Sequence, residues 1–221
     1  MTGSSQLAYL KALKTIKQEV GSLHGVPILD YLRHWRDVRG PEISLQQSPY
    51  QTLWSEIFRH SAEELSTALD VASDDIHHIG STSIPNMSAK PIIDQVLSVA
   101  AMPISHHGLH RLEQLGYVDY GASPVHPEVI WLWHRSAVPA QRVLHVCQRD
   151  NPWLQDALNF RDYLSQFDDQ RLAYQQRKQA LAAACAENLP LYSLEKATLL
   201  YRMSKAANRW RAEQALGPTS T

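Results

Sequence analysis

The chain has 221 residues, enough for one sizeable domain or for a domain with a helical appendage. Hydrophobic residues make up 44% and charged residues 19%, and the formal net charge of −1 gives no basic field for bulk nucleic-acid binding. No apolar run approaches the ~20 residues of a membrane span, the first six residues lack a signal-peptide pattern, and two cysteines suit a reducing compartment, so we expect a cytoplasmic location.

Residues 1–42 are predicted to form an N-terminal helical extension. Apolar residues recur at helical spacing over residues 5–20, and residues 28–38 fit a second, shorter helix. A Gly-Pro dipeptide follows and breaks the pattern. The main domain is therefore assigned to residues 43–216.

Helices and strands alternate through the main domain. A strong amphipathic helix is predicted to open at Pro49 and to run to Leu69. The remaining pattern predicts strands over 76–79, 92–99, 117–120, 129–134 and 142–148, and helices over 103–115, 153–167, 170–188 and 191–216. The last two strands are expected to pair antiparallel. This order predicts an α/β (α+β) fold, with a mixed sheet between helices.

The most informative stretch covers residues 78–94. Gly80 permits a close backbone approach, and three hydroxyl residues follow it: Ser81, Thr82 and Ser83. Turns of this composition offer backbone N–H groups and hydroxyls to phosphate. Small polar residues also simply form turns, so that alternative stays open.

Asp94 is an acid on an otherwise apolar predicted strand, where an unpaired carboxylate is costly. One interpretation is that it holds Mg²⁺ beside the phosphates of a nucleotide. The alternative is a structural acceptor that bonds the Gly80 turn or pairs with Lys90. A second metal carboxylate would be expected two residues on, on the same face, but that position is Val96, and Gln95 points to the other face.

Two further candidates lie close to predicted strands. Lys90 precedes a proline, so its backbone is extended, and it is placed to reach either a phosphate or Asp94. His145 lies within a predicted strand, where it is either a ligand for metal, phosphate or base, or a satisfied core histidine. The sequence has no Cys cluster for zinc, no H-E-x-x-H, no G-x-S-x-G and no Walker A motif.

The last candidates lie on predicted helices. Arg161 is placed either to clamp a phosphate with two hydrogen bonds or to pair structurally with Asp94 or Asp162. Lys196 is a further phosphate candidate, and a plain surface pair with Glu195 is its alternative.

The chain resembles the GrpB family over roughly residues 43–210. Four blocks carry the resemblance: H-I-G-S-T-S-I-P with K-P-I-I-D at 78–94, L-H-V at 144–146, F-R-D-Y-L at 160–164, and Tyr192 with Lys196. The chain departs from the family at Asn86, where glycine is usual, although asparagine tolerates positive φ well. It also departs before the L-H-V strand, where the family often has another histidine.

The resemblance implies a nucleotidyltransferase-like fold. The wider superfamily joins a Gly-Ser turn to a strand with two alternate carboxylates and transfers a nucleotidyl group from a nucleoside triphosphate. Gly80 and Ser81 match that turn and Asp94 matches the first carboxylate, whereas Val96 does not match the second. The implied phosphate ligands are Gly80, Ser81, Thr82, Ser83, Lys90, Arg161 and Lys196. Asp94 is expected to hold the metal, with His145 or a distant acid completing the shell, and Asp94 and His145 are the candidate catalytic residues.

Two functions follow as expectations. The first is an Mg²⁺-dependent nucleotidyltransferase that uses a nucleoside triphosphate and an unidentified acceptor. The alternative is a binding module of the same fold that recognises a nucleotide or another anionic small molecule without catalysis. A protein-interaction domain is a third, weaker option, and a homo-oligomeric state is left open.

Overall fold

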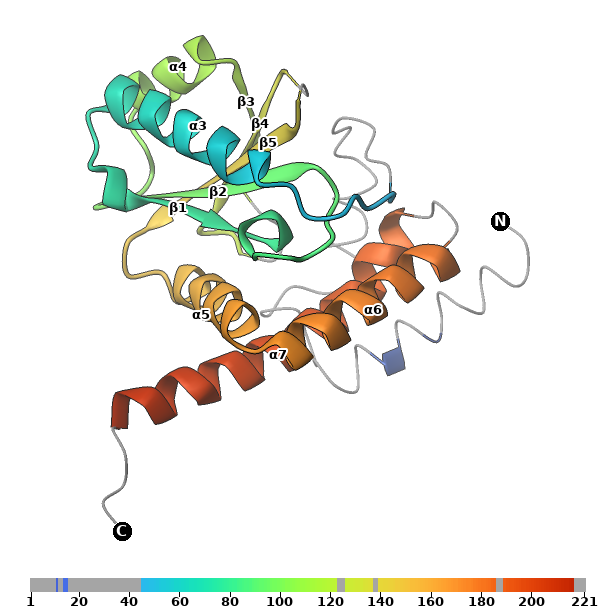
Figure 1. Cartoon of the computed structure of the whole chain (residues 1–221). Helices are drawn as coiled ribbons and strands as arrows, with labels where there is room; N and C mark the ends of the chain where they lie inside the picture. The colour runs from blue at the N-terminus through green and yellow to red at the C-terminus, as the bar shows by residue number, and fades with distance from the viewer. Residues whose placement is uncertain are drawn as a thin grey trace.

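The computed structural model describes residues 45–122, 126–136, 139–185 and 189–216, together with Lys11, Lys14 and Thr15. Those three residues are helical, and the rest of the predicted N-terminal extension lies outside the described residues. In the described ranges, one sheet lies between two groups of helices (Figure 1). None of the described helices is long and apolar enough to cross a membrane.

The sheet has five strands in the order β1-β2-β5-β4-β3. The central pair, β2 and β5, is parallel, and the other neighbouring pairs are antiparallel. The strands are β1 (Ile76–Ile79), β2 (Ile92–Val99), β3 (Tyr117–Ala122), β4 (Ile130–His134) and β5 (Gln141–Gln148). The predicted strands are thus confirmed to within two residues at each end, as is the antiparallel pairing of the last two.

Within the described ranges, five α-helices from Leu53 onward lie on the two sides of the sheet. Helices α3 (Leu53–Leu69) and α4 (His106–Gln114) lie on one face, and α5 (Pro152–Gln166), α6 (Asp168–Cys185) and α7 (Leu189–Leu216) lie on the other (Figure 1). The predicted start of the first of these helices, at Pro49, is wrong. Ser48 exchanges two backbone hydrogen bonds with Ala89, which keeps the chain extended there, and the helix begins at Leu53.

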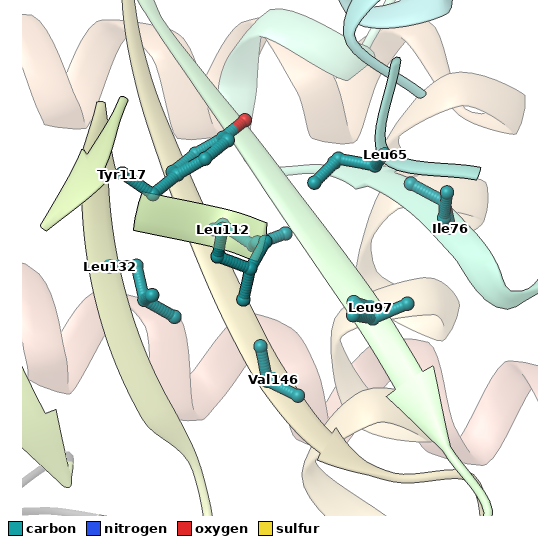
Figure 2. Close-up of a cluster of buried hydrophobic side chains, with 8 residues drawn as sticks. Leu65, Ile76, Leu97, Leu112, Tyr117, Leu132 and Val146 are labelled. Atoms are coloured by element: carbon teal, nitrogen blue, oxygen red, sulfur yellow. The ribbon is translucent and has the colours of Figure 1, made fainter. Parts of the chain in front are cut away.

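The two faces of the sheet carry separate cores. The core under α3 and α4 includes side chains from all five strands and both helices (Figure 2). Its buried members are Leu65, Ile76, Leu97, Leu112, Tyr117, Leu132, Leu144 and Val146. Gln95 faces this core and donates to the Tyr117 hydroxyl at 3.1 Å, so the prediction that it points away from Asp94 is confirmed.

The opposite face holds the C-terminal helices against the segment after the Gly80 turn. Ile84 and Met87 are fully buried among side chains of α5, α6 and α7: Phe160, Leu164, Tyr174 and Leu199. This packing fixes α6 and α7 beside the turn. The predicted α+β class, with a mixed sheet flanked by helices, is confirmed.

Candidate functional site

The turn after β1 is built on Gly80, which has φ 73° and ψ −175°. Only glycine adopts this backbone conformation readily. A β-carbon at Gly80 would lie 2.4 Å from Oδ2 of Asp94, closer than any two such atoms can approach. The glycine therefore lets the turn sit directly against the Asp94 side chain, and a short 3₁₀ helix, η2 (Ser81–Ser83), follows.

Thr82 joins β1 to the start of β2. Its hydroxyl donates to the Ile92 carbonyl at 2.9 Å and therefore accepts from Nε2 of His78 at 3.1 Å. The His78 ring stacks on Phe58, with ring centres 4.6 Å apart. Burial lowers the pKa of His78 to about 4, so the imidazole is neutral at neutral pH. Thr82 is buried and acts as a structural link within the turn.

The two remaining hydroxyls of the turn, those of Ser81 and Ser83, make different hydrogen bonds. Ser83 donates to the Gly80 carbonyl at 2.6 Å and closes the turn. Ser81 instead accepts a hydrogen bond of 3.1 Å from Nζ of Lys178, which also donates to the Ser88 carbonyl at 2.7 Å. Of the three hydroxyls expected to bind phosphate, Ser81 is thus the one that meets a cationic group.

Three lysines from separate parts of the chain gather at Ser81 and Asp94. Lys90 lies just before β2, Lys178 lies on α6, and Lys196 lies on α7. The charges of Lys90 and Lys196 act on Lys178, and the Asp94 carboxylate acts on Lys90 and Lys196. These three residues are called the lysine cluster below.

The lysine cluster is electrostatically strained. Burial is the largest cause that lowers the pKa of Lys178 to about 7 and of Lys90 to about 8, and the positive charge of Lys196 adds to both effects. Burial also lowers the pKa of Lys196, which the nearby Asp94 carboxylate partly offsets. One carboxylate thus acts on two half-buried amines, Lys90 and Lys196, which in turn repel the buried amine of Lys178.

Two tyrosines pack the lysine cluster into place. Tyr174 lies one helical turn before Lys178, and Tyr192 lies one turn before Lys196, so each pair shares a helix face. Nζ of Lys178 lies 5.6 Å from the ring centre of Tyr174, and Nζ of Lys90 lies 5.4 Å from that of Tyr192. Tyr174 and Lys178 were not identified from the sequence, although the Tyr-x-x-x-Lys spacing that they share with Tyr192 and Lys196 was a usable signal.

Asp94 and His145 lie on the same face of adjacent strands. Nε2 of His145 is 3.7 Å from Oδ1 of Asp94, whose side chain is 31% exposed. Val96, which neighbours His145 across the strands, is fully buried in the core formed with Ile79 and Cys147. The position expected for a second carboxylate is therefore part of the hydrophobic core.

The donor set around Asp94 fits an anion better than a metal ion. Within the described ranges, no three His, Cys, Asp or Glu side chains converge to hold a metal. Mg²⁺ prefers carboxylates, phosphates and water in a regular octahedron, and ammonium groups beside it add repulsion. The magnesium site stays a prediction without support from these donors.

Arg161 is already held by protein groups. Its Nη1 donates to the His78 carbonyl at 3.0 Å, and its Nε donates to Asp162 at 2.9 Å. Asp162 also receives a hydrogen bond from Arg211 of α7. The structural pairing with Asp162 that the sequence left open is thus present, and a phosphate-binding role for Arg161 stays a prediction.

A cavity of about 380 Å³ lies away from this site, beside α4 and β3 on the other face of the sheet. Its lining mixes basic and acidic side chains, including His110, Glu113, Asp119 and Arg135, and Glu113 lies 3.9 Å from both His110 and Arg135. The charges balance, so the lining does not favour an ion of either sign. The chemistry is concentrated at the lysine cluster instead.

Comparison with known proteins agrees with the motifs. Residues 44–206 match the family model for the GrpB protein. The chain belongs to the GrpB family. Asn86, where this family usually has glycine, adopts φ 61°, so the asparagine preserves the left-handed turn as expected.

Individual GrpB relatives cover most of this chain. It is 31% identical over 176 residues to a UPF0157 protein of Streptomyces coelicolor, covering 79% of this chain and 90% of that one. It is 29% identical over 162 residues to the UPF0157 protein YqkA of Bacillus subtilis, covering 73% of this chain but spanning only 47% of that relative. The crystal structure of the conserved protein GrpB from Enterococcus faecalis superposes with a TM-score of 0.63 at 27% identity, covering 75% of this chain and 99% of that one.

Proposed function

We propose that this GrpB protein binds a small polyanion at the lysine cluster, with nucleoside triphosphates as the first candidates. The observation that carries the proposal is the gathering of three lysines whose charges act on one another, with Lys178 bonded to the Ser81 hydroxyl and with one carboxylate, Asp94, beside Lys90 and Lys196. Ammonium groups that are partly or fully removed from water are costly unless they are paired, and one carboxylate cannot neutralise three of them.

The chemistry of the cluster favours phosphate groups. Lysine ammonium groups act as compact point charges with several donors, a common way of holding phosphates. Ser81 adds a hydroxyl at the same place, and Gly80 keeps the backbone close. A ligand with two or more negative charges balances the cluster and restores the protonated form of its lysines.

Transfer of a nucleotidyl group is a second candidate, favoured by the position of His145. Its Nε2 lies 3.7 Å from Asp94, so the imidazole is placed to take a proton from an acceptor hydroxyl while the carboxylate stabilises the resulting imidazolium. The acceptor and any metal requirement are part of this second proposal only.

Calorimetry at pH 7 tests the binding proposal. Wild-type protein is titrated with ATP, GTP, CTP and tripolyphosphate, each with and without Mg²⁺. Lys178→Met and Lys196→Met are expected to lose binding, and Lys205→Met, an exposed lysine on α7, serves as the matched control. Absence of binding by wild type to all four anions in both conditions would overturn the proposal.

Pyrophosphate release tests the second candidate. Nucleotides are incubated with a panel of small hydroxyl and amine acceptors, and His145→Gln is expected to abolish release even at nucleotide concentrations that saturate the variant. If wild type binds nucleotide but releases no pyrophosphate with any acceptor, the transfer proposal is withdrawn and the binding proposal remains.

A further inference from the structure

A group of aromatic rings lies on the same sheet face as Asp94, from three different elements. Trp131 lies on β4 directly opposite His145 on β5, and their ring centres are 5.5 Å apart at 89°. Trp153 lies in the first turn of α5, with its ring centre 5.2 Å from that of His145. Trp131, His145 and Trp153 are called the aromatic group below.

The aromatic group is held in place by the start of α5 and by the apolar core on this face of the sheet. The backbone N–H of Trp153 donates to the side chain of Asn151, which caps α5, at 2.9 Å. This hydrogen bond holds the backbone of Trp153 in place at the start of the helix. Both indoles pack on the apolar core that contains Val96 and Leu154. The two indoles are thus held by packing, so stacking on a planar ligand costs them little further conformational freedom.

Exposure sets these two tryptophans apart from the core ones. Trp54 and Trp133 are 1% and 7% exposed, whereas Trp131 and Trp153 are only half-buried. Large apolar rings left partly in water on one face mark a surface for a ligand or partner.

The histidine between the indoles points to a ligand independently. His145 is 7% exposed, and its Nδ1 is buried with no hydrogen-bond partner among the described residues. Buried polar atoms normally have such a partner, since leaving one unpaired costs free energy. The imidazole is therefore positioned by its contacts with the two indoles and with Asp94, and its Nδ1 is left without a protein partner among the described residues.

Asp94 connects the aromatic group to the lysine cluster. Its Oδ1 lies 3.7 Å from His145, and its charge acts on Lys90 and Lys196. A ligand that contacts both groups therefore passes the one carboxylate between them. A nucleotide has this order of parts: anionic phosphates, a sugar whose hydroxyls donate hydrogen bonds, and a planar base.

We infer that the aromatic group is a stacking subsite for the base of a nucleotide whose phosphates lie at the lysine cluster, with Asp94 against the sugar. This rests on the proposed binding function and adds the class of ligand. Stacking on the face of a base makes no hydrogen bonds to the edge of the base. The subsite is therefore expected to bind purine and pyrimidine nucleotides with only small differences in affinity.

Parallel titrations with nucleotides and tripolyphosphate test the subsite. Wild type is expected to bind ATP, GTP and CTP about tenfold more tightly than tripolyphosphate, with the three nucleotides within about threefold of one another. Trp153→Leu keeps apolar packing but removes the aromatic face, so it is expected to lower nucleotide affinity about tenfold and to leave tripolyphosphate affinity unchanged. Trp153→Phe is expected to restore most of the loss.

Trp210→Leu is the matched control, because Trp210 is also half-buried but packs on Tyr163 and Phe167. Equal wild-type affinity for nucleotides and tripolyphosphate would overturn the subsite and leave the binding function standing. The subsite would also be overturned if Trp153→Leu lowered the affinities for nucleotide and for tripolyphosphate equally while Trp153→Phe bound both like wild type. That result would assign the indole a structural role. Absence of any anion binding would instead overturn the proposed function itself.

Discussion

Replacement of Lys178 by methionine is expected to stabilise the fold while removing anion binding. Methionine has a similar length and no charge, so it fills the same buried space. Lys178 is 3% exposed, and burial with two neighbouring lysines lowers its pKa from 10.5 to about 7. The folded protein therefore carries a cost for this side chain that the unfolded chain does not.

The cost follows from proton linkage. Below pH 7 the lowered pKa of Lys178 corresponds to about 5 kcal/mol of lost stability. Methionine forfeits the hydrogen bonds to Ser81 and Ser88, at about 1 kcal/mol each, which leaves a net gain of roughly 3 kcal/mol at pH 6. Such a gain is large against a typical total of about 5–15 kcal/mol.

The sign of the effect reverses with pH. Between pH 7 and pH 10.5 the unfolded chain binds the Lys178 proton more strongly than the folded protein, so wild-type stability rises with pH across this window. Near pH 10 about 1 kcal/mol of the cost remains, against about 2 kcal/mol for the two lost hydrogen bonds. Lys178→Met is then expected to be about 1 kcal/mol less stable than wild type.

Urea unfolding at pH 6 and at pH 10 measures both values. Lys205→Met, on an exposed site of the same helical layer, is expected to change stability by less than about 0.5 kcal/mol at either pH. The reasoning is refuted if Lys178→Met is less stable than wild type at pH 6, or if its difference from wild type is the same at both pH values.

Three further outcomes are expected. Tripolyphosphate affinity should fall at least about tenfold from pH 7 to pH 9, because the lysine cluster loses protons over this range, and a flat calorimetric profile would argue against it. Gly80→Ala should lower the free energy of unfolding, measured in urea, by about 2–4 kcal/mol, because it adds backbone strain and a collision with Asp94. Gly121 has φ 81° and open space around it, so Gly121→Ala should lower the free energy of unfolding by only about 1–2 kcal/mol. Equal losses for the two variants would contradict the close contact between Gly80 and Asp94. In Cys185→Ser protein at pH 8, Cys147 should react with a thiol reagent only as fast as the protein unfolds, because burial raises its pKa to about 11, and rapid labelling of folded protein would show otherwise.

The sheet could be predicted from sequence because its signals are local. β2 and β5 both carry valine and leucine at their centres, as expected for central parallel strands, and both were predicted to within one residue. The start of α3 was not predictable in this way. It depends on the bridge between Ser48 and Ala89, which are 41 positions apart and pair only in the folded chain.

The site was predicted where one short segment defines it. Gly80 and Asp94 meet because the turn and β2 are close in sequence, and positive φ at Asn86 was expected from the resemblance to a family that usually has glycine there. Lys178 was missed because it is one lysine on a long polar helix, and only packing of α6 against the turn buries it. The electrostatic character of the site therefore arises from tertiary contacts.

Binding of tripolyphosphate without Mg²⁺, measured by calorimetry in buffers of different ionisation enthalpy, tests the central claim most directly. Tripolyphosphate carries the charge of a nucleotide and no base, so it isolates the lysine cluster. We predict measurable binding at pH 7.5 with net proton uptake, and loss of both in Lys178→Met protein whose circular dichroism matches wild type. Absence of binding, or binding that Lys178→Met leaves unchanged, would contradict the assignment of the lysine cluster as a polyanion site.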